Sequence, residues 1–174
     1  MVPNEITWST VSRSRKSSFS KRIIFLGAFS PEKGGDLIDS VLPKLKSLGF
    51  DPEIWGVPGV IKHSPLTVTS FKDATELETL RSRAEGAIVC TPSLWPETFS
   101  YTFYEAIGIL KTPVVVGPFG HPAKVTRDQK LGTVMKDRSA NALVDAILAC
   151  AKDYSKIQGR VFDTVLTENV ISRQ

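Results

Sequence analysis

The chain has 174 residues, of which 41% are hydrophobic, and a net charge of +4. This length suits one compact core better than two domains, and no apolar run approaches the roughly 18 residues that a membrane span needs. Five basic residues and one acidic residue within residues 1–22 account for the whole net charge, so the remainder is neutral. We therefore expect a cytoplasmic protein with no nucleic-acid partner. Peripheral contact of the basic arm with the inner face of a membrane stays open.

Three segments follow from the pattern of hydrophobic residues. Residues 1–20 are basic, rich in Ser and without a sustained period, which is typical of a linker or arm. Residues 21–154 carry the strand and helix patterns of one domain. Residues 155–174 contain "RVFDTVL" and are expected to form a further helix or an arm.

Within residues 21–154, short apolar runs alternate with helical periods. The predicted strands are residues 22–29 ("RIIFLGAF"), 52–57, 66–71, 86–90, 112–117 and 132–135. The predicted helices are residues 34–48, 73–84 (with a capping box of Asp73 and Glu76), 99–110, a turn near 122–129, and 141–154 (capped by Ser139). Parallel neighbours need crossover connections. The alternation therefore predicts an α/β fold with a doubly wound, Rossmann-like parallel sheet.

The loop after the first strand reads "GAFSPEKGGD". Ligands of open parallel sheets bind beyond the carboxyl ends of strands. Gly27 ends the strand, and Lys33 and Gly34 precede the helix, so this loop can present a cation and backbone N–H groups to a phosphate. Neither a Walker A loop nor a G-x-G-x-x-G pattern occurs in the chain, which argues against ATP hydrolysis and NAD binding. The alternative is a solvated lysine in a turn.

The loop after the "GAIVC" strand contains "PETFSYTFYEA", in which Glu97 and Glu105 lie eight positions apart. At a rise of 1.5 Å per residue their separation is about 12 Å. Catalytic carboxylate pairs need about 5 to 9.5 Å, so the two are not an acid and base dyad. They can instead accept hydrogen bonds from hydroxyls at the two ends of one extended ligand, such as a nucleoside diphosphate sugar. The alternative is two solvated surface acids.

Other reactive residue types carry little signal. Cys90 and Cys150 lie in apolar patterns and are expected to be buried, reduced thiols, and no residues have the spacing of a metal site. Trp95 is expected to be a packed anchor beside the loop. His63 and His121 have no Ser, Cys or metal partner in the pattern and are expected to be structural or solvated; of the two, His121 is the better candidate for the edge of the ligand cleft.

"PETFSYTFYEA" followed by "TPVVV" resembles the donor-binding motif of retaining glycosyltransferases of GT-B fold. That large family includes sucrose synthases, glycogen synthases and bacterial polysaccharide transferases. "FLGAFSPEKGGDLI" is similar to the glycine and lysine loop of the family's C-terminal domain, "IWGVPG" to its second strand and "SANALVDAIL" to its closing helix. The resemblance covers residues 22–153 and implies one half of a GT-B fold.

The resemblance implies a role for each site residue. Glu105 would bind the ribose hydroxyls, and Glu97 would lie nearest the transferred sugar. The expected substrate-binding residues are Gly27, Lys33, Gly34, Glu97, Phe99, Ser100, Tyr101 and Glu105. The implied reaction transfers a hexose, with retention, from a nucleoside diphosphate sugar to a saccharide or lipid-linked acceptor in surface polysaccharide synthesis. No other cofactor and no metal are implied.

The sequence departs from the family pattern in three places. Ala28 stands where the family usually has Arg, so one of two phosphate cations is missing. The segment after Glu105 is one residue longer than usual, and Ser100 stands where Gly is commoner. The chain also corresponds to the donor half alone, which implies a missing N-terminal acceptor domain and no activity of the isolated chain. Two alternatives stay open: a non-catalytic nucleotide-sugar-binding module and half of a GT-B-like sugar-nucleotide epimerase.

Overall fold

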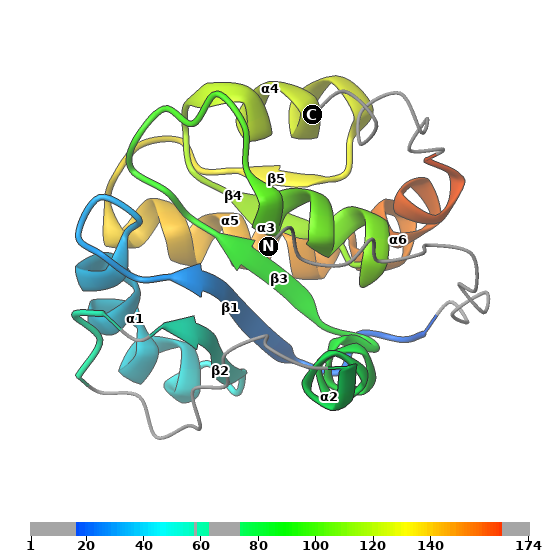
Figure 1. The fold of residues 1–174 in the computed structure, drawn as a ribbon, viewed down its shortest axis with the longest axis horizontal. Helices are drawn as coiled ribbons and strands as arrows, with labels where there is room; N and C mark the ends of the chain where they lie inside the picture. The colour runs from blue at the N-terminus through cyan, green and yellow to red at the C-terminus, as the bar shows by residue number, and fades with distance from the viewer. Residues whose placement is uncertain (1–16, 58, 63–73, 165–174) are drawn as a thin grey trace, which may run out of the picture.

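The computed structural model of the protein describes residues 17–57, 59–62 and 74–164. Within this part of the chain, five strands form one sheet in the order β2-β1-β3-β4-β5, and each neighbouring pair is parallel. The strands are β1 (Arg22–Ala28), β2 (Asp51–Val57), β3 (Ile88–Thr91), β4 (Val114–Val116) and β5 (Gly132–Val134) (Figure 1). The predicted doubly wound parallel sheet is confirmed.

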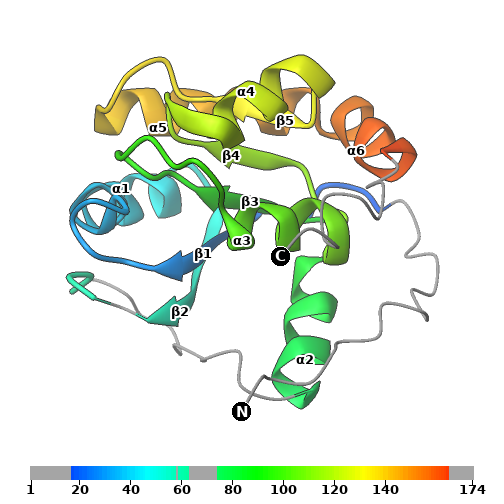
Figure 2. The same ribbon diagram turned by 45° about the horizontal axis from the view of Figure 1, so that its top comes forward.

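Helices cover both faces of the sheet. They are α1 (Gly35–Ser47), α2 (Ala74–Ala84), α3 (Tyr101–Tyr104), the π-helix η1 (Glu105–Ile109), α4 (Gly120–Gln129), α5 (Ala140–Lys152) and α6 (Tyr154–Asp163). α1 and α5 contact each other on one face, and α3, η1 and α4 lie on the other (Figures 1 and 2). Helices on both faces of an open parallel sheet define a doubly wound fold.

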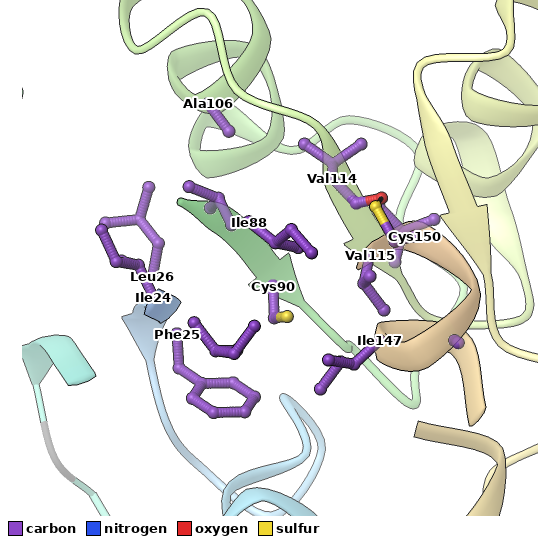
Figure 3. Close-up of a cluster of buried hydrophobic side chains, with 14 of the residues drawn as sticks. Ile24, Phe25, Leu26, Ile88, Cys90, Ala106, Val114, Val115, Ile147 and Cys150 are labelled. Carbon is purple, nitrogen blue, oxygen red and sulfur yellow. Dashed lines mark hydrogen bonds between the residues drawn. The ribbon is translucent and has the colours of Figure 1, made fainter. Parts of the chain in front are cut away.

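The core lies where the central strands meet α5. Phe25, Cys90 and Val115 are register neighbours on β1, β3 and β4, and all three are fully buried. Figure 3 shows them beside Ile147 of α5, with Ala106 of η1 on the other side of the strands. Strands buried on both faces lack a polar alternation, which explains why their sequences read as continuous apolar runs.

Both cysteines are free and buried, as predicted. Cys90 lies in β3 and Cys150 near the end of α5. Burial raises the pKa of the Cys150 thiol to about 12 and that of Cys90 well above its usual value. Both are therefore inert thiols at neutral pH.

One predicted helix has a different geometry. Residues 99–110 were expected to form a uniform α-helix, but α3 gives way to a π-helix at Glu105. The N–H of Leu110 donates to the carbonyl of Glu105 at 3.0 Å, five residues back. Such a turn holds one residue more than an α-helical turn. The helix therefore departs from the predicted α-helical geometry from Glu105 onwards.

Other elements agree with the sequence or extend it. Ser139 caps α5, since its hydroxyl accepts a hydrogen bond from the N–H of Ala142 at 3.1 Å. α4 is longer than the single turn expected near residues 122–129. His63, the predicted strand at residues 66–71 and the capping residue Asp73 lie outside the described residues.

The two ends of the described chain pack together. The N–H of Ser17 donates to Gln158 of α6 at 3.2 Å, and the ring of Phe19 lies 5.1 Å from that of Tyr154. α6 buries Ile157 and Val161. Across the described ranges, no helix is both long and apolar enough to span a lipid bilayer.

Candidate donor-binding site

The order of strands in the sheet reverses between β1 and β3, because β2 was added on one side of β1 and β3 on the other. β1 lies between β2 and β3, and its connection through α1 covers one face of the sheet, while α3 after β3 covers the other (Figure 2). The loops that leave these two strands therefore diverge at the carboxyl edge. Such a divergence opens a crevice in which ligands of parallel sheets bind.

A pocket of about 260 Å³ occupies this crevice. Its walls come from the end of β1 and the loop after it, the end of β3 and the loop after it, and the start of α3. They comprise residues 26–29, Lys33, residues 91–93, Glu97 and residues 99–102. Both loops chosen from the sequence thus face one cavity.

Opposite charges meet in this pocket. The ammonium group of Lys33 forms an ion pair with the Oε1 atom of Glu97. The Glu97 side chain is 11% exposed, whereas that of Lys33 is 47% exposed. The carboxylate is therefore held inside the wall, and the lysine reaches it from the solvent side.

Two glycines allow the loops around the pocket to touch. Gly34 has a φ of +83°, and a Cβ atom there would lie 2.6 Å from the carbonyl oxygen of Pro92. Gly120 has a φ of +85°, and its Cβ would lie 2.6 Å from the backbone nitrogen of Glu97. Real Cβ atoms do not approach backbone atoms so closely, and positive φ is strained for other residues. Glycine at both positions thus lets the loops after β1 and β4 pack on the loop after β3.

Hydrogen bonds fasten the same loops. The N–H of Leu94 donates to the carbonyl of Glu32 at 3.0 Å, which joins the loops after β3 and β1. The N–H of His121, in the first turn of α4, donates to the carbonyl of Glu97 at 2.8 Å. The backbone of Glu97 is therefore held by α4 as well as by its own loop.

The start of α3 forms the opposite wall. Ser100 is buried and caps the helix, because its hydroxyl accepts a hydrogen bond from the N–H of Phe103 at 3.4 Å. The ring of Phe99 stacks on that of Tyr104 at 4.9 Å and meets Tyr101 edge-on at 5.0 Å. These contacts order the N-terminal turn that faces the pocket.

A tyrosine and a histidine connect the two helices next to the site. The Tyr104 hydroxyl and Nε2 of His121 share a hydrogen bond of 2.7 Å. Tyr104 directly precedes Glu105, and the His121 N–H holds Glu97. His121 is not among the residues that line the pocket, and these contacts give it a structural role beside the site. The pair thus ties together the segments that carry the two glutamates.

Glu105 begins η1 and does not line the pocket described above. Its side chain is half-buried, and burial raises the pKa of its carboxyl above the usual value. Among the described residues, no ion pair or side-chain hydrogen bond to this carboxylate is present. A partly buried carboxylate without a partner is characteristic of functional sites.

The pocket therefore brings together six of the eight predicted site residues: Gly27, Lys33, Glu97, Phe99, Ser100 and Tyr101. Gly34 does not line the pocket, but it packs closely against the backbone of Pro92, which does. Ala28 lines the wall where the family resemblance implies an arginine. Lys33 is consequently the sole cationic residue among the lining residues.

Sequence reasoning did not single out Thr91 in the wall of the pocket, and it misjudged Trp95, which is not among the lining residues. Thr91 ends β3, lines the pocket and is buried, and its hydroxyl has no hydrogen-bond partner among the described residues. A polar residue at the carboxyl end of an apolar strand was the available signal. Trp95 was expected to be a packed anchor, which is wrong, because it is 65% exposed.

Three solved structures share this fold. A glycosyltransferase from Rickettsia africae ESF-5 superposes with a TM-score of 0.64 at 17% identity, over 92% of this chain and 50% of that one. Sucrose-phosphate synthase from Thermosynechococcus elongatus superposes with a TM-score of 0.63 at 18% identity, over 86% of this chain and 42% of that one. TarM superposes with a TM-score of 0.62 at 20% identity, over 94% of this chain and 36% of that one. The chain thus spans half or less of the length of these proteins.

The comparison of sequences agrees with that of structures. No curated protein matches the chain significantly in sequence. The sequence profile of the family described as "Glycosyl transferases group 1" matches residues 64–160, which is more than half of the chain. The chain belongs to the group 1 glycosyl transferase family and has the Rossmann-like fold of a GT-B half.

Proposed function

We propose that the chain is the donor-binding domain of a retaining glycosyltransferase. The donor is a nucleoside diphosphate sugar, from which a hexose passes to a saccharide or lipid-linked acceptor in surface polysaccharide synthesis. The observation that carries the proposal is the pocket at the carboxyl edge of β1 and β3, where Lys33 and Glu97 face each other. Family membership supplies the class of reaction.

Each part of the donor has a matching group. Lys33 and the backbone N–H groups around Phe99, Ser100 and Tyr101 bind the diphosphate, because cations and a helix start attract anions. Glu97 accepts hydrogen bonds from hydroxyls of the transferred sugar. Glu105 accepts them from the ribose, which would occupy its carboxylate.

The domain contributes binding and orientation to the reaction. Glycosyl transfer needs the acceptor in near-attack geometry, and such positioning accounts for roughly 7 to 11 kcal/mol of the barrier. We expect a second, N-terminal domain to hold the acceptor and to close over the donor, which excludes water. The isolated chain is therefore expected to bind the donor without transferring the sugar.

A second candidate is a non-catalytic nucleotide-sugar-binding module. It is favoured by Ala28, which leaves Lys33 as the one cation among the lining residues. Weak neutralisation of the diphosphate would slow departure of the leaving group more than it would weaken binding. Turnover in the presence of the second domain distinguishes this module from an enzyme.

Calorimetric titration tests the proposal. Wild type and Glu105→Gln are titrated with uridine, adenosine and guanosine diphosphates and with their hexose esters. Loss of hydrogen bonds to a charged group costs roughly 1.5 to 3 kcal/mol, so the variant should bind about tenfold to a hundredfold more weakly.

Glu85→Gln is the matched control, because Glu85 is exposed and precedes β3 at the opposite edge of the sheet. It should bind like wild type. Failure of all the nucleotides and sugar nucleotides to bind wild type would contradict a donor-binding domain, and equal affinity of Glu105→Gln would remove the ribose role.

A further inference from the structure

The pocket contains an ion pair between two of its lining residues. Lys33 and Glu97 both line the cavity and pair with each other across it. Among the ion pairs of the described residues, neither side chain takes part in a second one. An anionic ligand that draws the ammonium group of Lys33 away from Glu97 therefore leaves that carboxylate without an ion-pair partner.

Glu97 has little freedom to follow the lysine or to turn to solvent. Its side chain is 11% exposed, and its carbonyl accepts a hydrogen bond from the N–H of His121. The close approach of Gly120 to its backbone nitrogen restrains the other side of the same residue. The backbone that carries the carboxylate is thus held in the wall of the pocket.

We propose that the Lys33–Glu97 ion pair makes the pocket select a diphosphate that carries a sugar over the bare diphosphate. This inference rests on the proposed function, because it assumes that the diphosphate of the donor binds beside Lys33. It adds a means of discrimination between the donor and the nucleotide that remains after transfer.

The discrimination follows from the cost of a buried, unpaired charge. A bare diphosphate gains Lys33 but leaves the Glu97 carboxylate without a partner, and an unpaired buried charge is strongly unfavourable. A sugar on the diphosphate restores partners, since its hydroxyls donate to the carboxylate. Both charges are then satisfied, Lys33 by phosphate and Glu97 by the sugar.

The same exchange favours release of the spent nucleotide. When the sugar has left, Glu97 again lacks a donor and competes with the diphosphate for Lys33. Re-formation of the ion pair therefore weakens the hold on the bare nucleotide. Equally tight binding of the donor and of the bare nucleotide would slow release of the bare nucleotide.

Binding of inorganic diphosphate to the 174-residue chain tests the proposal without a choice of base or sugar. Wild type, Glu97→Gln, Lys33→Ala and the double variant are titrated by calorimetry. Removal of the carboxylate frees Lys33, so Glu97→Gln should bind diphosphate roughly threefold to tenfold more tightly than wild type. In the Lys33→Ala background, the same change should give no gain.

Glu32→Gln is the matched control. Glu32 is an exposed carboxylate next to Lys33 in the chain, and its side chain makes no ion pair with that lysine among the described contacts. It should tighten binding less than Glu97→Gln does. If glutamine at position 97 prevents folding, as judged by thermal unfolding, Glu97→Ala replaces it, since it also removes the carboxylate.

Three results would overturn the inference: equal or weaker binding of diphosphate by Glu97→Gln, a gain that persists without Lys33, or a gain matched by Glu32→Gln. Absence of diphosphate binding in all variants counts as equal binding by wild type and Glu97→Gln, and so also overturns the inference. The proposed function fails separately, if sugar nucleotides do not bind wild type. The two failures are therefore distinguishable.

Discussion

Glu105 stands out among the carboxylates because the fold holds it half-buried without a partner. Among the described residues, no side chain neutralises it, and burial raises the pKa of its carboxyl. The folded state consequently binds the proton more tightly than the unfolded chain does. The contribution of Glu105 to stability is therefore greatest at low pH and is lost as the pH rises from the ordinary value of 4.5 through the folded pKa.

Glu105→Gln should thus be more stable than wild type at pH 7 and equal to it near pH 4. Urea unfolding at the two pH values measures the difference, with Glu85→Gln as the control for loss of one carboxylate. Combined with weaker nucleotide binding, a gain in stability would identify a residue kept for its ligand. A variant less stable than wild type at pH 7 would instead show that the carboxylate is satisfied within the fold.

Individual residues of the site were predictable where the chemistry and the loop position agreed. Lys33 and Glu97 follow strands and carry the charges that a phosphate and a sugar need, so the sequence placed both at the carboxyl edge. Their ion pair was not predicted, because it depends on the distance between two loops 64 positions apart. Roles in substrate binding stay predictions.

The loops after β1, β3 and β4 pack against one another, and Gly120 is one of the close contacts between two of them. Gly120→Ala would place a Cβ 2.6 Å from the nitrogen of Glu97, in a backbone with φ of +85°. Gly49→Ala is the matched control, because φ there is +82° but nothing lies within 4 Å of the added Cβ. The two variants share the conformational strain and differ in the steric clash.

Gly49→Ala should lower the free energy of unfolding by about 1 to 2 kcal/mol from strain alone. Gly120→Ala should cost about 1 to 3 kcal/mol more, because the loop of Glu97 must shift. Guanidinium unfolding measures both, and nucleotide-sugar binding should weaken only in Gly120→Ala. Equal losses of stability would mean that the loops yield to the added methyl group.

The π-helix shows why periodicity alone missed an element. Phe103, Ala106, Ile107 and Leu110 are buried, and their spacing also fits an α-helix. One extra residue in the turn does not disturb this apolar stripe. The π-helix at Glu105–Ile109 therefore leaves no mark in the hydrophobic pattern.

The order of elements was predictable for most of the domain because each strand is a short apolar run and each helix has an apolar stripe. Burial on both faces of β1, β3 and β4 makes those runs unmistakable. The exact ends of α4 and α6 were not predictable from the sequence, because their apolar faces are short and their flanks are polar. Helix ends depend on contacts that a sequence does not display.

The pocket lies at one edge of the sheet. The carboxyl ends of β1 and β3, the pocket and both predicted glutamates lie towards it, and the buried Glu53, paired with Arg22 and Arg83, lies near the amino ends of the strands. Solved structures of the same fold are at least twice as long as the part that this chain matches. We propose that the acceptor domain faces the same edge.

Titration of the ¹⁵N-labelled chain with nucleoside diphosphate hexoses, followed by amide chemical shifts, tests donor binding at this edge most directly. The account predicts saturable shifts at Gly27, Lys33 and Ser100 for at least one donor, with little change at Glu53 and Gly86 near the amino ends of the strands. Absence of saturable shifts for every donor, or shifts that cluster away from the pocket, would contradict it.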